Sequence, residues 1–106
     1  MVSNQIIKAI NRAENYPYIV RVGVFGSYAR GEATHASDID ILIDYNNSSD
    51  DFLDDLDNFI EDIEMIIRAK IDFITLPGLL KSRDKEFRDE VLRDIRWIYN
   101  RRISNV

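Results

Sequence analysis

The chain lacks cysteine altogether, and it has only four glycines and two prolines among its 106 residues. Without cysteine there is no disulfide framework, no thiolate nucleophile and no cysteine-ligated zinc site, so we expect a reducing, cytoplasmic compartment. The sequence also lacks any apolar run near the ~18 residues of a membrane span, and it lacks the apolar stretch of a signal peptide. We therefore expect a soluble protein with no membrane partner.

Positive charge is scarce as well, because 14 Lys and Arg stand against 19 Asp and Glu, for a formal net charge of −5. Strong non-specific binding to nucleic acids depends on basic residues that displace counterions from phosphates, so this balance argues against it. The charges are unevenly placed: residues 50–64 carry eight acids and no base, whereas residues 81–102 carry eight bases and five acids. This asymmetry favours a partner with both basic and acidic regions, and it leaves a homo- or hetero-oligomer open.

With 45% hydrophobic residues, the chain has the length and composition of one domain covering residues 1–106. Residue periodicity predicts helices and strands in alternation. The expected elements are a helix over 3–14, a strand over 19–25, a short helix from Ser27 to Gly31, a strand over 38–45, a helix over 51–69, a strand over 70–76 and a helix from about Asp84. Residues 96–99 either extend this last helix or form a short edge strand. The pattern predicts an α/β (α+β) fold, a small mixed β-sheet flanked by helices and covered mainly on one side.

Aspartates recur on one face of two of the predicted strands. Asp38 and Asp40 lie two residues apart, so their Cα atoms are ~6.6 Å apart on the same face of the strand over 38–45. Asp72 has the same setting on the next strand. If these two strands are neighbours, three carboxylates meet, and their repulsion favours one or two Mg²⁺ ions. Asp44 shares the face but lies ~13 Å further along, beyond direct coordination.

A Gly-Ser turn follows the first predicted strand. Gly26 allows the backbone to approach a ligand closely, and Ser27 opens a short helix whose free N–H groups attract phosphate. Gly31 is placed to end that helix in a left-handed conformation. A phosphate-binding turn facing a set of metal-binding carboxylates is typical of metal-assisted phosphoryl or nucleotidyl transfer.

Four polar residues near these motifs have weaker assignments. Arg30 either binds phosphate or forms an ion pair with Glu32 or another nearby acid. Ser37 either contacts the nucleotide or caps the turn before the strand. We interpret His35 as a solvated loop residue and Lys70 as an ordinary lysine at a helix end.

Residues 26–31 (GSYARG) followed by 37–40 (SDID) resemble the signature of the DNA polymerase β superfamily of nucleotidyltransferases. The small size is similar to that of the minimal nucleotidyltransferases, the MntA-like members often paired with a HEPN-domain toxin. The motif covers a short stretch, but Asp72 and the flanking helices extend the similarity over nearly the whole chain. No residue of the motif is missing.

The resemblance implies a polymerase-β-type fold in which Asp38 and Asp40 hold two Mg²⁺ ions and Asp72 completes the catalytic and metal-binding set. Asp72 would help to activate the acceptor hydroxyl, and Gly26 and Ser27 would hold the triphosphate. An acceptor hydroxyl would attack the α-phosphate of a nucleoside triphosphate and release pyrophosphate. In the HEPN-paired members the donor is ATP and the acceptor is a tyrosine of the toxin.

The first functional hypothesis is therefore a Mg²⁺-dependent nucleotidyltransferase that modifies a HEPN-domain protein as the antitoxin of a toxin–antitoxin pair. A second is a non-catalytic binding antitoxin that masks its partner. A third is an enzyme acting on a small hydroxylated acceptor such as an aminoglycoside, although the chain lacks the additional domain that would form such a pocket.

Overall fold

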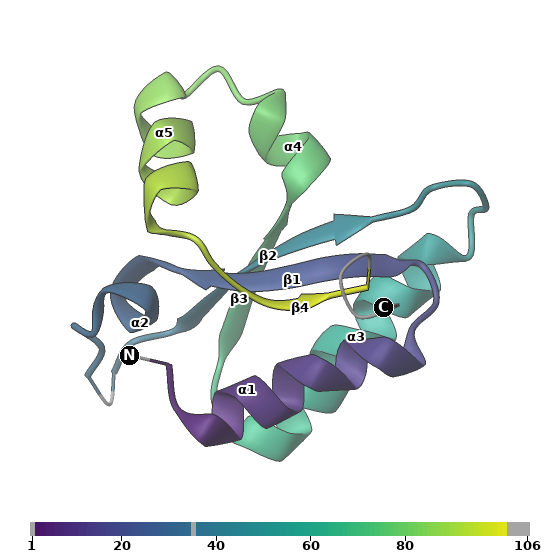
Figure 1. Cartoon of the computed structure of the whole chain (residues 1–106), viewed down its shortest axis with the longest axis horizontal. Coiled ribbons are helices and arrows are strands. Elements are labelled where there is room, and N and C mark those ends of the chain that lie inside the picture. Colours follow the sequence, from purple (N-terminus) through teal and green to yellow (C-terminus); the bar gives the residue numbers. More distant parts are fainter. Residues whose placement is uncertain (1, 35, 102–106) are drawn as a thin grey trace.

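The computed structural model describes residues 2–34 and 36–101, and it arranges them as a four-stranded sheet with helices on both faces (Figure 1). The strand order is β3-β2-β1-β4. In chain order the elements are α1 (Asn4–Ile10), the 3₁₀ helix η1 (Asn11–Asn15), β1 (Ile19–Phe25), α2 (Gly26–Arg30), β2 (Ile39–Tyr45), α3 (Phe52–Ile67), β3 (Ile71–Thr75), α4 (Leu76–Leu80), α5 (Lys85–Asp94) and β4 (Arg96–Asn100).

The sheet is mixed, which confirms the predicted fold class. β1 runs antiparallel to both β2 and β4, whereas β2 and β3 are parallel. The parallel pair is possible because α3 carries the chain from the end of β2 back to the start of β3. The two strands that carry the aspartates are therefore neighbours, as the metal-site hypothesis requires.

The larger part of the core lies between the sheet and the pair α1 and α3, which cover the lower face in Figure 1. Phe59 and Ile63 of α3 are fully buried there, together with Ile41 and Ile43 of β2. The strict alternation of β2 directs these isoleucines to one face and the aspartates to the other. The sheet is thus covered mainly on one side, as predicted.

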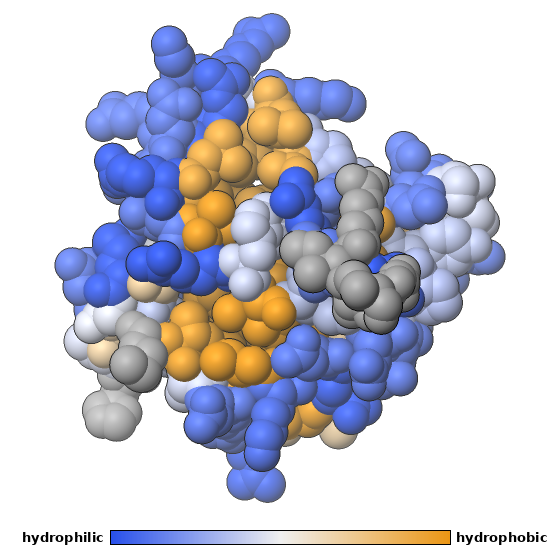
Figure 2. Space-filling model, in the orientation of Figure 1, coloured by the Kyte–Doolittle hydropathy of each residue, from blue (hydrophilic) through white to orange (hydrophobic). Residues whose placement is uncertain are grey.

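A smaller cluster covers part of the opposite face, where α4 and α5 lie. It consists of Phe25, Leu42, Leu79 and Val91. Figure 2 shows hydrophobic side chains over α4 and between α4 and α5, with hydrophilic side chains on the outer surface of α5. This second layer leaves Asp40 beside α5 instead of facing open solvent.

The C-terminal segment resolves the alternative that the sequence left open. Helix α5 begins at its N-cap Asp84, whose side chain accepts a hydrogen bond from the Phe87 amide at 3.0 Å, and it ends at Asp94. Residues 96–100 then form β4, which pairs with β1. The strand is favoured over a longer helix because the edge of β1 offers a row of backbone hydrogen-bonding groups that must be satisfied.

Helix α4 was not predicted from the sequence, which indicated only a strand over 70–76 before the helix from about Asp84. Its signal is nevertheless present, because Thr75 is the N-cap and its Oγ1 accepts from the Gly78 amide at 3.2 Å. Proline in the first turn is also favourable for a helix start. None of the helices in residues 2–34 and 36–101 has the length and apolar character needed to cross a membrane.

Candidate active site

Asp40 and Asp72 are register partners on the parallel strands β2 and β3. Their side chains leave the same face of the sheet, because partners in a parallel pair have the same orientation. Asp38 lies just before β2 begins and is half-buried. The structure therefore places the three aspartates that the sequence singled out at the same end of two paired strands.

The pKa of Asp40 is raised above its ordinary value, chiefly because burial disfavours the charged form. The negative charges of Asp72 and then Asp38 raise the pKa further, whereas Arg30 opposes them. The Asp40 carboxyl therefore lies within reach of the charges of Asp38, Asp72 and Arg30.

The chemistry of this donor set suits Mg²⁺, since hard divalent cations prefer carboxylate oxygens. In the described part of the chain, however, no three acidic or histidine side chains already lie in an arrangement that could hold a metal ion. Asp72 is exposed, and Oδ2 of Asp38 lies 3.7 Å from Nζ of Lys70. Asp38, Asp40 and Asp72 would be the residues that hold the ion.

Gly26 approaches the Asp40 carboxylate closely. Its φ of +72° is unfavourable for residues with a side chain, and an added Cβ would lie 2.5 Å from Oδ2 of Asp40. Gly26 begins α2, and Gly31 ends it with φ 74° in the left-handed conformation, as the sequence predicts. Gly26 is therefore required for both the turn and the close approach to Asp40.

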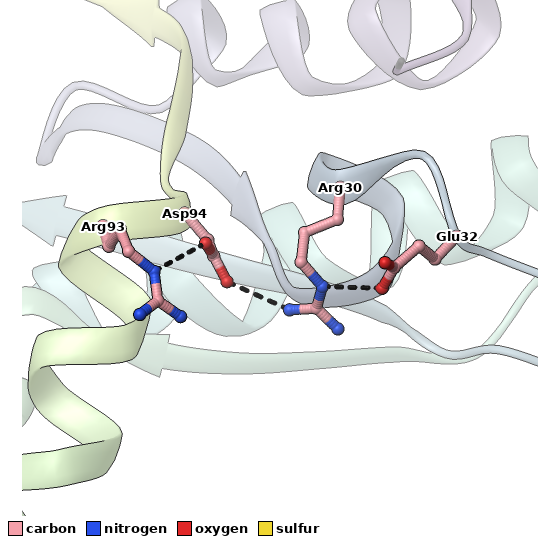
Figure 3. Close-up of polar contacts among 4 residues, drawn as sticks. All are labelled: Arg30, Glu32, Arg93 and Asp94. Atoms are coloured by element: carbon pink, nitrogen blue, oxygen red, sulfur yellow. Dashed lines mark hydrogen bonds and ion pairs between the residues drawn. The ribbon is translucent and has the colours of Figure 1, made fainter.

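Arg30 at the end of α2 is held by two carboxylates (Figure 3). Its Nε donates to Glu32 at 2.8 Å, and its Nη1 donates to Asp94 of α5 at 3.0 Å. Hydrogen bonds to Glu32 and then Asp94 raise the pKa of Arg30, and the hydrogen bond from Arg30 is the main cause that lowers the pKa of Asp94. Of the two assignments left open for Arg30, the structure shows the ion pair.

A cavity of about 200 Å³ opens between this cluster and α5. Gly26, Arg30 and Asp40 line it on the side of the motif, and Phe87, Glu90, Val91 and Asp94 line it on the side of α5. These four residues of α5 follow the spacing i, i+3, i+4 and i+7, which places them on one helical face. The sequence predicted the helix from about Asp84, but the acidic pair Glu90 and Asp94 on its inward face was missed.

The remaining predicted residues lie near the motif with local roles. Ser37 Oγ accepts from the Thr34 amide at 2.9 Å, so the structure shows its turn-capping role. Ser27 is half-buried in the first turn of α2. Lys70 is 70% exposed and pairs with Asp38 instead of serving only as a helix-end lysine. His35 lies outside the described residues.

Asp44, the fourth acid on this face of β2, lies apart from the site. Its Oδ2 accepts from Nε of Arg21 at 3.2 Å, and the Arg21 guanidinium stacks over Trp97 at 4.1 Å from the ring centroid. This placement agrees with its predicted exclusion from metal coordination.

A Gly-Ser turn beside paired aspartates on a mixed sheet defines the class of nucleotidyltransferases. The model of the nucleotidyltransferase domain family matches residues 4–98, so the chain belongs to this family.

Two curated relatives with sequence similarity to this chain are named protein adenylyltransferases. The protein adenylyltransferase MntA of Thermococcus cleftensis is 35% identical over 80 residues, which cover 73% of this chain and 72% of the relative. A candidate protein adenylyltransferase of Methanocaldococcus jannaschii is 41% identical over 54 residues, 51% of this chain and 54% of the relative. The match thus spans about half the length of that relative.

Solved structures show the same fold. A candidate minimal nucleotidyltransferase has a TM-score of 0.66 at 29% identity, with 85% of this chain and 86% of that chain covered. A complex of a tri-AMPylated HEPN toxin from Shewanella oneidensis with an MNT antitoxin has a TM-score of 0.55 at 19% identity, over 96% of this chain and 72% of that chain. At that identity the likeness concerns the fold alone.

Proposed function

We propose that the chain is a Mg²⁺-dependent nucleotidyltransferase that transfers AMP from ATP to a hydroxyl group of a protein partner. The observation that carries this proposal is the pairing of Asp40 with Asp72 on neighbouring strands, with Asp38 two residues before Asp40 and with Gly26 packed against the Asp40 carboxylate. An acceptor on a protein is favoured because the MntA relative is named a protein adenylyltransferase. The most direct candidate for the partner is a HEPN-domain toxin, with this chain as its antitoxin.

The chemistry is a single displacement at phosphorus. The acceptor oxygen forms a bond to the α-phosphorus, the bond to the pyrophosphate oxygen breaks, and the acceptor proton passes to a nearby carboxylate, for which Asp72 is the proposed group. Bound Mg²⁺ supplies charge neutralisation for the phosphate oxygens and the leaving pyrophosphate. Asp38 and Asp40 would hold the ion.

The turn at Gly26 and Ser27 contributes the binding of the triphosphate. Because Gly26 has no side chain, phosphate oxygens can approach the backbone of the turn closely, and a metal ion held by Asp40 would offset the repulsion between the phosphate and that carboxylate. Arg30 and Ser37 are further candidates for phosphate contacts. Arg30 is held by its hydrogen bond to Asp94, and Ser37 by the hydrogen bond that it accepts from the Thr34 amide. Phe87 and Val91 form an apolar side of the same cavity.

The test is a transfer assay with Mg²⁺ and ATP labelled either at the α- or at the γ-phosphate, with the co-purified HEPN partner as acceptor. The α-label should appear on the partner, and the γ-label should leave as pyrophosphate. A γ-label retained on the partner would indicate kinase chemistry and would refute the nucleotidyltransferase assignment.

A further inference from the structure

Helix α5 contacts the motif through one end of its inward stripe. Val91 is buried in the smaller core, and Asp94, one turn further along, has a side chain only 12% exposed. Asp94 is the last residue of α5, and Arg96 two positions later pairs with Val24 of β1. The Asp94 backbone is therefore fixed from both sides, by a packed helix and by the sheet.

This fixed carboxylate holds the end of the Arg30 side chain. Arg30 is 40% exposed and separated from Asp94 by 64 positions in the chain, yet its Nη1 lies 3.0 Å from Oδ2 of Asp94. Glu32 binds the guanidinium from the other side, but its side chain is 64% exposed and belongs to the loop after α2. Asp94 is thus the more rigid of the two partners.

Arg30 keeps donor groups for a ligand. A guanidinium has five N–H donors, and in residues 2–34 and 36–101 only those on Nε and Nη1 have acceptors. Arg30 lines the same cavity as Gly26 and Asp40, four residues after Gly26 and hence on the same face of α2. A phosphate beside Gly26 would meet these unused donors without breaking the contact to Asp94.

We propose that Asp94 is a positioning residue of the site, which holds the Arg30 guanidinium at the cavity so that its unused N–H groups bind a phosphate of the nucleotide. This role rests on the proposed function. A fixed guanidinium binds phosphate better than a mobile one, because the side chain loses less conformational freedom on binding. Asp94 does not touch the nucleotide itself.

The experiment is a double-mutant cycle in which the affinity for ATP in Mg²⁺ buffer is measured by calorimetry on the full chain. We expect Arg30→Met and Asp94→Ala each to weaken ATP binding about ten-fold, since hydrogen bonds to charged groups are among the strong ones. The double variant should bind no more weakly than Arg30→Met alone. Asp94→Glu should recover part of the ATP affinity that Asp94→Ala loses. If Asp94→Ala does not fold, Asp94→Asn replaces it in the cycle.

Arg93→Ala is the matched control, because Arg93 also contacts Asp94, at 3.4 Å, but does not contact Arg30. It should leave ATP affinity unchanged within about two-fold. If Asp94 has a purely structural role, Asp94→Ala should weaken ATP binding by the same factor in the parent and in the Arg30→Met background. That result would overturn the proposal. If the parent binds ATP and Asp94→Ala binds it equally well, only the positioning role fails. If the parent binds no ATP, the proposed function fails together with it.

Discussion

Gly26 and Asp40 lie so close that residue 26 cannot carry a side chain without meeting the carboxylate. A β-carbon there would lie 2.5 Å from Oδ2 of Asp40, at a backbone φ of +72°. The turn that would bind phosphate and the strand that would bind metal are therefore in direct contact through Gly26 and Asp40. This relationship gives the most direct test of the site.

Gly26→Ala should abolish nucleotidyl transfer and destabilise the fold, because the new methyl group displaces Asp40 and the left-handed backbone alone costs about 1–2 kcal/mol. Gly31→Ala is the matched control, since Gly31 has a similar φ of +74°. Gly31→Ala should lose folding stability through the same backbone cost but retain most of the transfer activity. Urea denaturation and the transfer assay compare the two variants, and equal loss of activity in both would contradict the role assigned to the Gly26 contact.

Asp40→Asn should leave the metal-free protein at least as stable as the parent at neutral pH. The folded pKa of Asp40 is raised above its ordinary 3.8, so the folded state binds this proton more tightly than the unfolded state. Stability therefore falls as the pH rises from the unfolded pKa through the folded pKa, and above both the charged carboxylate destabilises the fold. The advantage of Asp40→Asn should disappear near about pH 3, where the parent is protonated.

Thermal melts in EDTA and in Mg²⁺ measure this difference. Mg²⁺ should stabilise the parent by mass action and should stabilise Asp40→Asn much less. If Asp40→Asn melts far below the parent in EDTA, Asp40 is a structural group and the metal-site hypothesis is wrong.

Asp38→Asn separates catalysis from masking of the partner. The change preserves size and removes one charged ligand, so the fold and the partner contact should remain while transfer is lost. Co-purification with the partner and growth of cells that express both proteins are the measurements. We expect the variant to bind the proposed HEPN partner but fail to silence it. Silencing at the level of the parent would instead support the non-catalytic antitoxin.

Arg101→Lys should destabilise the fold by about 1–3 kcal/mol, because it removes several hydrogen bonds from a charged donor. Arg101 donates to four backbone carbonyls around the end of the first helical segment, those of Ile19, Ala13, Glu14 and Tyr16. A lysine has one compact ammonium group and cannot reach all of them. Arg96→Lys, at an exposed position of β4, the strand that ends just before Arg101, is the control and should change the urea midpoint little.

The sequence alone determined the elements whose periodicity is strong and the motifs that are local. Alternating residues predicted β2 and directed Asp38 and Asp40 to the face opposite the isoleucines. The stripe of α3 predicted the longest helix, and Gly26 and Gly31 marked the bounds of α2. These signals are readable because each depends on residues within a few positions of one another, where backbone geometry fixes the faces.

The tertiary structure decided what depends on distant partners. Residues 96–100 became a strand because β1 had an open edge, a fact that the RWIY sequence does not contain. Asp72 meets Asp40 because β2 and β3 pair in parallel with these residues in register. Arg30 faces Asp94 across 64 positions because α5 packs against the sheet through Val91. Local periodicity sets which face a side chain takes, whereas packing of the two cores decides which faces meet.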